Sequence, residues 1–256
     1  MYRRMVLVTI GLLFGVTLGA QQQAGPTAPP PTPRQAAPIE VTGNWVSVIT
    51  EEWRWRMITP PKGDFTSIPL SPAGKEASDR WEPSMDGSCL AYGAGGVMRM
   101  PTRLRIAWDG DAALRVEADA GQQTRRLSFT SAPAAAAAPS LQGVSVAAWE
   151  PLGGQPIMRN GQRSGPAPAG GTLRVTTTSL AEAWLRRNGA SYSTRATILE
   201  YWDTMRFPND DVWLVVTQII SDPKYLLNDY TTSMHFKREA DGSKWRPSPC
   251  RPASGA

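Results

Sequence analysis

Histidine and cysteine are scarce in this chain, which has one histidine and two cysteines among 256 residues. A single histidine argues against a histidine-based metal site and against a Ser-His-Asp triad. Charge is modest as well, because 27 basic and 22 acidic residues give a formal net charge of +5. No basic run with interleaved aromatic residues occurs, so nucleic acid is not an expected partner. We expect no metal and no other cofactor.

Long hydrophobic runs are also missing, with one exception at the start of the chain. Residues 1–20, MYRRMVLVTIGLLFGVTLGA, have a short basic start, an apolar middle and a small-residue end. This arrangement is typical of a secretory signal peptide. A membrane anchor is the alternative, but the apolar middle is shorter than the ~20 residues that a span needs. We therefore expect cleavage near Ala20, no membrane span in the mature chain, and a periplasmic or secreted protein.

Helix signals are few, whereas glycine and proline are frequent, with 23 of each. Residues 21–38 are rich in Pro, Ala and Gln and are expected to form a disordered spacer. One β-rich domain is expected over residues 39–250, followed by a tail at 251–256. Within this domain the Gly/Pro-rich residues 151–171 are expected to be a long flexible loop.

Most of the domain alternates polar and apolar residues with a period of two, which indicates strands. Asp109-Gly110 separates two such runs and is a strong hairpin signal. About eight or nine strands in mainly meander order predict an antiparallel lipocalin-like barrel, closed or nearly closed, because closure removes exposed strand edges. One or two short helices are expected, with candidates that are capped by Ser71 and that run from Ser179 to Gly189.

The two cysteines are Cys89 and Cys250. In an oxidising compartment they can form one disulfide, which would tie the C-terminus to the body of the domain. The chain-entropy model gives such a long loop about 4–5 kcal/mol of stabilisation. The alternative is two unpaired thiols, and we expect the bridge.

The stretch EEWRWRM, residues 51–57, is dense in charged and aromatic side chains. As a strand, or two strands joined by a bulge, it would place alternate residues on opposite faces, Glu51 with the two tryptophans and Glu52 with the two arginines. We expect the tryptophans to face into the barrel and the arginines to face outward or to lie at the rim. An aromatic face would stack an apolar or sugar-like ligand, and an arginine face would hold an anionic group. The alternative is an aromatic core with a solvated row of charges.

Later strands add further candidates. Alternation places Glu200 and Trp202 on one face and Asp203 on the other, and Trp213 lies on the next run. A carboxylate beside a tryptophan in a cavity can act as a general acid or base. His235 shares a face with polar residues and is expected to be structural or exposed. No catalytic residue is assigned. The candidate ligand-binding residues are Glu51, Trp53, Arg54, Trp55, Arg56, Glu200, Trp202 and Trp213.

The pair Gly43-x-Trp45 resembles the Gly-x-Trp signature of lipocalin-like barrels, in which the glycine permits a close entry turn and the tryptophan packs across the closed end of the barrel. The runs PLSPAGKEASDRWEP, LQGVSVAAWE and VVTQIISDPKYLLNDYTTSMHFKR resemble a large family of uncharacterised exported bacterial proteins. That resemblance covers roughly residues 68–250 and includes both cysteine positions. It implies a shared role for the cysteines, such as pairing, and implies no activity.

Three functions remain open at this point. The first is an exported lipocalin-like protein that binds a small apolar or amphipathic ligand. The second is a lyase, isomerase or hydrolase of small molecules that uses carboxylate acid/base catalysis. The third is a structural protein of the cell envelope with no ligand. No feature of the sequence indicates a particular oligomeric state.

Overall fold

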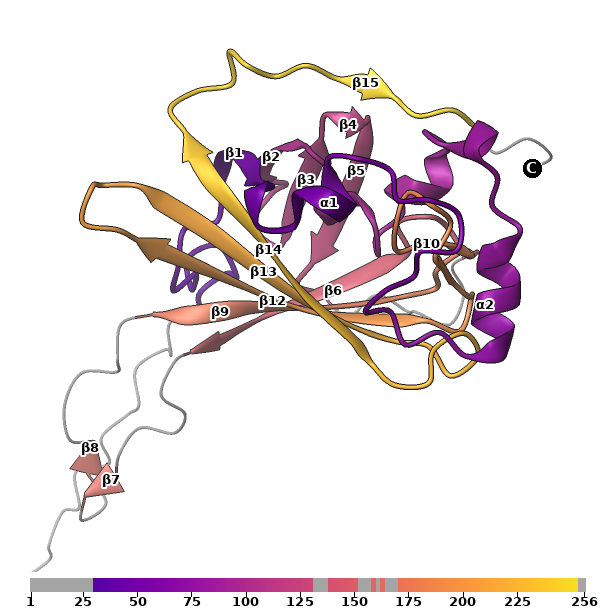
Figure 1. Cartoon of the computed structure of the whole chain (residues 1–256). Helices are drawn as coiled ribbons and strands as arrows, with labels where there is room; N and C mark the ends of the chain where they lie inside the picture. The colour runs from indigo at the N-terminus through magenta and orange to yellow at the C-terminus, as the bar shows by residue number, and fades with distance from the viewer. Residues whose placement is uncertain (1–29, 131–137, 152–157, 160–161, 164–169, 253–256) are drawn as a thin grey trace, which may run out of the picture. The chain divides into compact units, whose positions relative to one another are not determined.

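Nine strands close into a barrel in the computed structural model, which describes residues 30–130, 138–151, 158–159, 162–163 and 170–252 (Figure 1). Around the barrel the strands are β1 (Gly43–Val48), β14 (Tyr230–Glu239), β13 (Val212–Ser221), β12 (Thr197–Arg206), β9 (Gly171–Thr178), β6 (Val144–Pro151), β5 (Gln123–Ser128), β3 (Ala113–Ala118) and β2 (Arg103–Trp108). This confirms the predicted fold class. The predicted signal peptide lies outside the described residues.

One neighbouring pair in the barrel, β5 and β6, is parallel, and all the others are antiparallel. An odd number of strands cannot alternate in direction all the way around a closed ring, so one parallel pair is required. The parallel contact is short, with Leu127 opposite Ser145 and Ser128 opposite Val146. The predicted meander is therefore correct for most of the barrel and interrupted at this one seam.

Short elements lie between the barrel strands, and one, β15, follows the last of them. The helices are η1 (Thr50–Glu52), α1 (Trp53–Arg56), α2 (Pro72–Asp79), η2 (Pro83–Met85), η3 (Cys89–Tyr92) and η4 (Val97–Arg99), where η marks a 3-10 helix. The two-residue strands pair as β4 (Ala120–Gly121) with β15 (Ser248–Pro249), β7 (Met158–Arg159) with β8 (Gln162–Arg163), and β10 (Ala183–Trp184) with β11 (Ser191–Tyr192). The pair β7 and β8 falls within the predicted loop 151–171, most of which lies outside the described residues.

Local sequence patterns predicted the structure correctly at a hairpin turn and at a helix cap. Asp109 and Gly110 join β2 to β3, and Gly110 has a φ of 69°, the left-handed conformation that glycine adopts without strain. Ser71 caps α2, because its hydroxyl oxygen accepts a hydrogen bond of 3.1 Å from the amide of Gly74.

Two predicted elements are wrong. The strand expected to run through residue 57 ends at Val48, and the chain turns into η1 and α1. The helix expected between Ser179 and Gly189 is replaced by the β10–β11 hairpin. In both places tertiary contacts override a local pattern. The hairpin buries Leu180, Ala183 and Leu185 together, whereas a helix would spread these side chains over more than one face.

Apolar side chains fill the barrel. The largest are Trp45, Trp202 and Phe236, all 0% exposed, and they pack with leucines and valines from every side of the ring. A second cluster covers one barrel end and includes Ile198, Ile220 and Tyr230 at the strand ends, as well as residues of the β10–β11 hairpin. Trp45 is fully buried, and its indole donates a 3.0 Å hydrogen bond to the Val41 carbonyl.

The last part of the predicted spacer contacts the barrel. The indole of Trp149 donates a 2.7 Å hydrogen bond to the carbonyl of Pro33, and the amide of Arg34 donates to the carbonyl of Asp111 at 3.1 Å. Trp149 also packs against Phe129, with ring centroids 5.3 Å apart. Contacts with the domain therefore begin several residues before Ile39, where order was expected to start.

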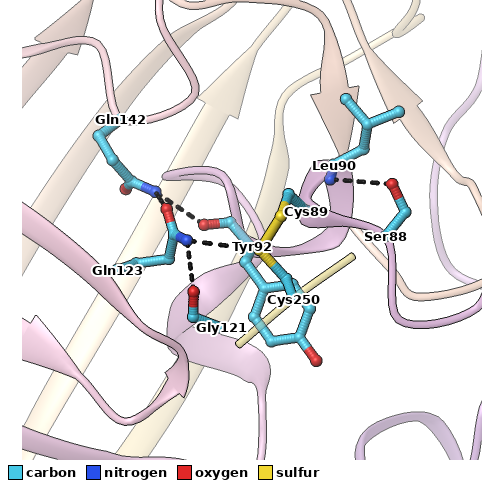
Figure 2. The surroundings of a disulfide bond; sticks show 8 residues. All are labelled: Ser88, Cys89, Leu90, Tyr92, Gly121, Gln123, Gln142 and Cys250. Atoms are coloured by element: carbon cyan, nitrogen blue, oxygen red, sulfur yellow. Dashed lines mark hydrogen bonds between the residues drawn. A yellow bond between two sulfur atoms is a disulfide. The ribbon is translucent and has the colours of Figure 1, made fainter. Parts of the chain in front are cut away.

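Cys89 and Cys250 form the predicted disulfide, with Cα atoms 4.9 Å apart (Figure 2). Gln123 lies against it, and its side-chain amide donates to the Gly121 carbonyl and lies 3.6 Å from the Cys250 sulfur. The amide of Cys89 donates to the carbonyl of Arg251 at 2.8 Å. The bridge therefore holds the C-terminal segment against η3 and the end of β4.

Candidate functional site

The barrel interior contains a polar network built around Glu200 on β12. Arg125 on β5 donates to both carboxylate oxygens of Glu200, at 3.0 and 2.7 Å, and these side chains are 2% and 0% exposed. The amide of Gln218 donates to the same carboxylate at 2.7 Å. Thr177 and Ser145 accept weaker hydrogen bonds from Arg125, at 3.2 and 3.4 Å.

This network spans five strands that follow one another around the ring. Its members come from β5, β6, β9, β12 and β13. A charge pair removed from water remains stable only when its hydrogen bonds are made within the protein, as they are for Glu200. Both oxygens of Glu200 are in contact with Arg125 or Gln218, and none of the described cavities is lined by this residue. The geometry gives Glu200 a structural role.

A second polar cluster lies where η1 and α1 pack against η4 and the β10–β11 hairpin. We call it the arginine cluster and define it as Arg56, Arg99 and Arg186, which are 2%, 4% and 4% exposed. Arg56 folds back and donates 2.9 Å hydrogen bonds to the carbonyls of Arg99 and Val48. These two bonds close the turn that ends the predicted strand at Val48.

One carboxylate contacts the arginine cluster among the described residues. Glu52 accepts a 2.6 Å hydrogen bond from Arg99, and Arg99 also donates to the hydroxyl of Thr232. Burial and the neighbouring charge of Arg99 lower the pKa of Arg56 to about 10, against weaker opposing effects of Glu52 and Glu51. Burial also lowers the pKa of Arg186. The lowered pKa values follow first from the burial of both guanidinium groups and, for Arg56, also from the like charge of Arg99.

The predicted residues 51–56 lie around this cluster, but not as predicted. Trp53 is 57% exposed and Arg56 is buried, so the expectation of inward tryptophans and outward arginines is wrong. Trp55 is half-buried, with the guanidinium of Arg186 5.0 Å and that of Arg54 5.3 Å from its ring centroid. The physical reason is the helical turn, which replaces the two-residue period of a strand with a period of about 3.6.

Two other predicted residues of this stretch make surface ion pairs. Arg54 contacts the carboxylate of Asp64 at 3.2 Å. Glu51 contacts Nδ1 of His235 at 2.5 Å, on the outer face of β14. The His235 ring lies 6.2 Å from that of Trp213, so the predicted ligand residue Trp213 is linked to Glu51 through His235 on the outside of the barrel.

The predicted residues therefore separate into two places. Glu51 to Arg56 and Trp213 lie outside the barrel, whereas Glu200 and Trp202 lie inside it, as alternation along β12 predicted for these two residues. Asp203 is on the opposite face of β12 from Glu200. The carboxylates considered for acid/base chemistry consequently do not converge on one point with Glu200.

Sequence reasoning missed Arg99, Arg125 and Arg186. The burial of Arg125 could have been predicted, because it lies on the same strand face as the apolar Leu127. Arg99 follows a glycine-rich run, and Arg186 lies in the segment mistaken for a helix. No local pattern marks these two, because only the fold brings them close to Arg56.

Three comparisons with known proteins find no similar protein. No family model, no curated protein and no solved structure matches the chain significantly. The resemblance to exported bacterial proteins therefore stays an expectation. In the part of the chain that the structure describes, no helix is long and apolar enough to cross a membrane, and no group of three or more His, Cys, Asp or Glu side chains is placed to hold a metal ion.

Proposed function

We propose that this protein is an exported, lipocalin-like barrel that binds a small amphipathic ligand at its rim. The observation that carries the proposal is the composition of residues 53–58. Trp53, Met57 and Ile58 are 57%, 51% and 57% exposed, and they form three of the seven large exposed hydrophobic side chains among the described residues. They come from the same segment as Arg56 of the buried arginine cluster.

The rim is favoured over the interior because the interior is occupied. Trp45, Trp202 and Phe236 are fully buried and belong to the same core cluster inside the barrel. A ligand in the barrel would have to displace these side chains. At the rim, by contrast, an apolar tail covers surface that is already exposed to water, which is favourable by about 25 cal/mol per Å² of apolar surface.

Export is supported by two independent features. The first twenty residues have the pattern of a signal peptide. The disulfide between Cys89 and Cys250 fits a compartment that is oxidising. The ligand would therefore be met in the periplasm or outside the cell.

The test is calorimetric titration of the chain from residue 21 onward with amphiphiles of one head group and increasing tail length. We expect affinity to rise with tail length. Trp53→Ala should weaken binding about tenfold or more, because a buried large apolar side chain contributes roughly 1.5–3 kcal/mol. Met205→Ala is the matched control, since Met205 is 50% exposed but lies on β12.

Three results would contradict the proposal. The first is an affinity that does not depend on tail length, and the second is equal binding by wild type and Trp53→Ala. Binding by wild type that is lost equally in Met205→Ala would place the ligand elsewhere on the barrel and would also reject the rim site.

A further inference from the structure

The arginine cluster has more positively charged groups than there are carboxylates in contact with it. Three guanidinium groups are buried to at least 96%, whereas Glu52 is the one carboxylate in direct contact with them among the described residues. Glu51 acts on Arg56 from further away and is itself engaged with His235. Buried charges in proteins are normally paired, because desolvation of an isolated ion is costly.

The cluster also has hydrogen-bond donors that no protein group fills. They are Nη2 of Arg56, Nε and Nη1 of Arg186, and the indole nitrogen of Trp55, each of which is shielded from solvent. More than nine in ten buried polar groups in folded proteins have a partner, and an exception calls for a water or an ion. Three side chains with unfilled donors at one place therefore indicate a bound acceptor.

These side chains line one small cavity. Trp55, Arg56, Arg99 and Arg186 border it, and Arg187 completes its basic lining, although Arg187 is already paired with Asp86 at 3.2 Å. The space open to the centre of a water-sized group is about 10 Å³. A cavity needs roughly 10–15 Å³ by this measure to hold one water molecule. The cavity thus has room for about one atom of that size.

We propose that this cavity is a binding site for a small monovalent anion, namely a halide or one oxygen of a carboxylate group. Nitrogen donors and positive charge select an anion rather than a cation or a neutral molecule. The volume holds one atom, so a tetrahedral phosphate or sulfate cannot enter whole, and we expect these bulkier ions to bind more weakly than a halide or a planar carboxylate. Where the carboxylate belongs to the proposed amphipathic ligand, this inference rests on the proposed function and supplies the chemistry of its head group.

The first experiment uses the wild-type chain and needs no mutation. Crystals of residues 21–256 grown in sodium bromide should show an anomalous scattering peak in the cavity between Arg56 and Arg186. Titration calorimetry should show binding of bromide and formate, and much weaker binding of sulfate and phosphate. An empty or water-filled cavity in bromide, or phosphate binding as tight as formate binding, would overturn the proposal.

The second experiment removes one guanidinium. Arg186→Met should raise the Kd for formate about tenfold or more, which corresponds to the loss of one hydrogen bond to a charged group. Arg105→Met is the matched control, because the Arg105 guanidinium also lies over an indole ring, 4.3 Å from that of Trp245, but outside the cavity. Its Kd should stay within about twofold of wild type. Equal Kd values for wild type and Arg186→Met would reject the site.

Two further arms separate this inference from the proposed function. Formate tests the anion site without a tail, and a neutral amphiphile with the same tail tests the apolar surface without a head charge. Formate binding without any amphiphile binding leaves the anion site standing and rejects the proposed function. Binding of a carboxylate amphiphile that depends on Trp53 but not on Arg186, with no binding of formate, supports the proposed function and rejects the anion site.

Discussion

Replacing Glu200 by glutamine tests whether the interior network is structural. The change keeps the side-chain volume and removes the charge, which leaves Arg125, 2% exposed, without its carboxylate. Breaking a buried ion pair from one side costs about 3–5 kcal/mol, because the remaining charge is uncompensated. For a domain of this size each kcal/mol lowers the melting temperature by about 2–4 °C, so a fall of about 6–20 °C is expected.

The assays are thermal melts and urea unfolding, both followed by circular dichroism, with the slope of the urea transition checked for constancy. Glu150→Gln is the control, because Glu150 pairs with Arg174 at 3.6 Å on the surface, where both side chains are more than 40% exposed. A pair of that kind contributes at most about 1 kcal/mol. The difference in stability between the two glutamine variants therefore measures the effect of burial, because both variants remove the same charge.

A double variant, Arg125→Met with Glu200→Leu, completes the design. It removes both charges and fills the space with apolar groups, which is often neutral or stabilising. We expect it to be at least about 2 kcal/mol more stable than the sum of the two single changes indicates. The reasoning is refuted if Glu200→Gln costs less than about 1 kcal/mol, or if the effects of the two single changes simply add.

Two further predictions concern the parts outside the barrel. Reducing the disulfide, or changing both Cys89 and Cys250 to serine, should lower the free energy of unfolding by up to about 5 kcal/mol, since the bridge spans 161 residues. The measurement is the urea midpoint with and without dithiothreitol, and an unchanged midpoint would contradict the prediction. Gly189→Ala should destabilise by about 2 kcal/mol or more, because Gly189 has a φ of 82° and a Cβ there would lie 2.2 Å from the Cβ of Trp81. Gly63→Ala, with a φ of 81° and nothing within 4 Å of the added carbon, should show the smaller cost of backbone strain alone in the same thermal melts.

The fold was predictable where a residue's neighbours in sequence are also its neighbours in the sheet. Alternation along β12 and β14 correctly separates Glu200 from Asp203 and places His235 on the outer face, because a strand has two faces and one is apolar. The Asp109-Gly110 hairpin was predictable for the same reason. Turn chemistry acts within a few residues and needs no knowledge of the rest of the chain.

The candidate site was predictable only in part. The sequence marks residues 51–57 as unusual, but their alternation is equally compatible with a strand and with a helical turn. The choice is made by Arg56, which finds carbonyl partners on Val48 and Arg99. Arg186 joins from a hairpin 130 positions beyond Arg56 in the chain. Contacts over such separations depend on the completed fold, so local pattern cannot supply them.

Strand β1 lies between β2 and β14, and this position governs when the barrel can form. Its register with β14 places Asn44 opposite Glu239, so the ring closes by joining nearly the first and the last residues of the domain. Pairing between segments so distant in sequence is slow, since a long loop must be ordered before the contact forms. A chain that emerges N-terminus first would thus hold β1 with one edge unpaired until β14 arrives. Assembly of the ring is consequently a late event that needs the whole chain.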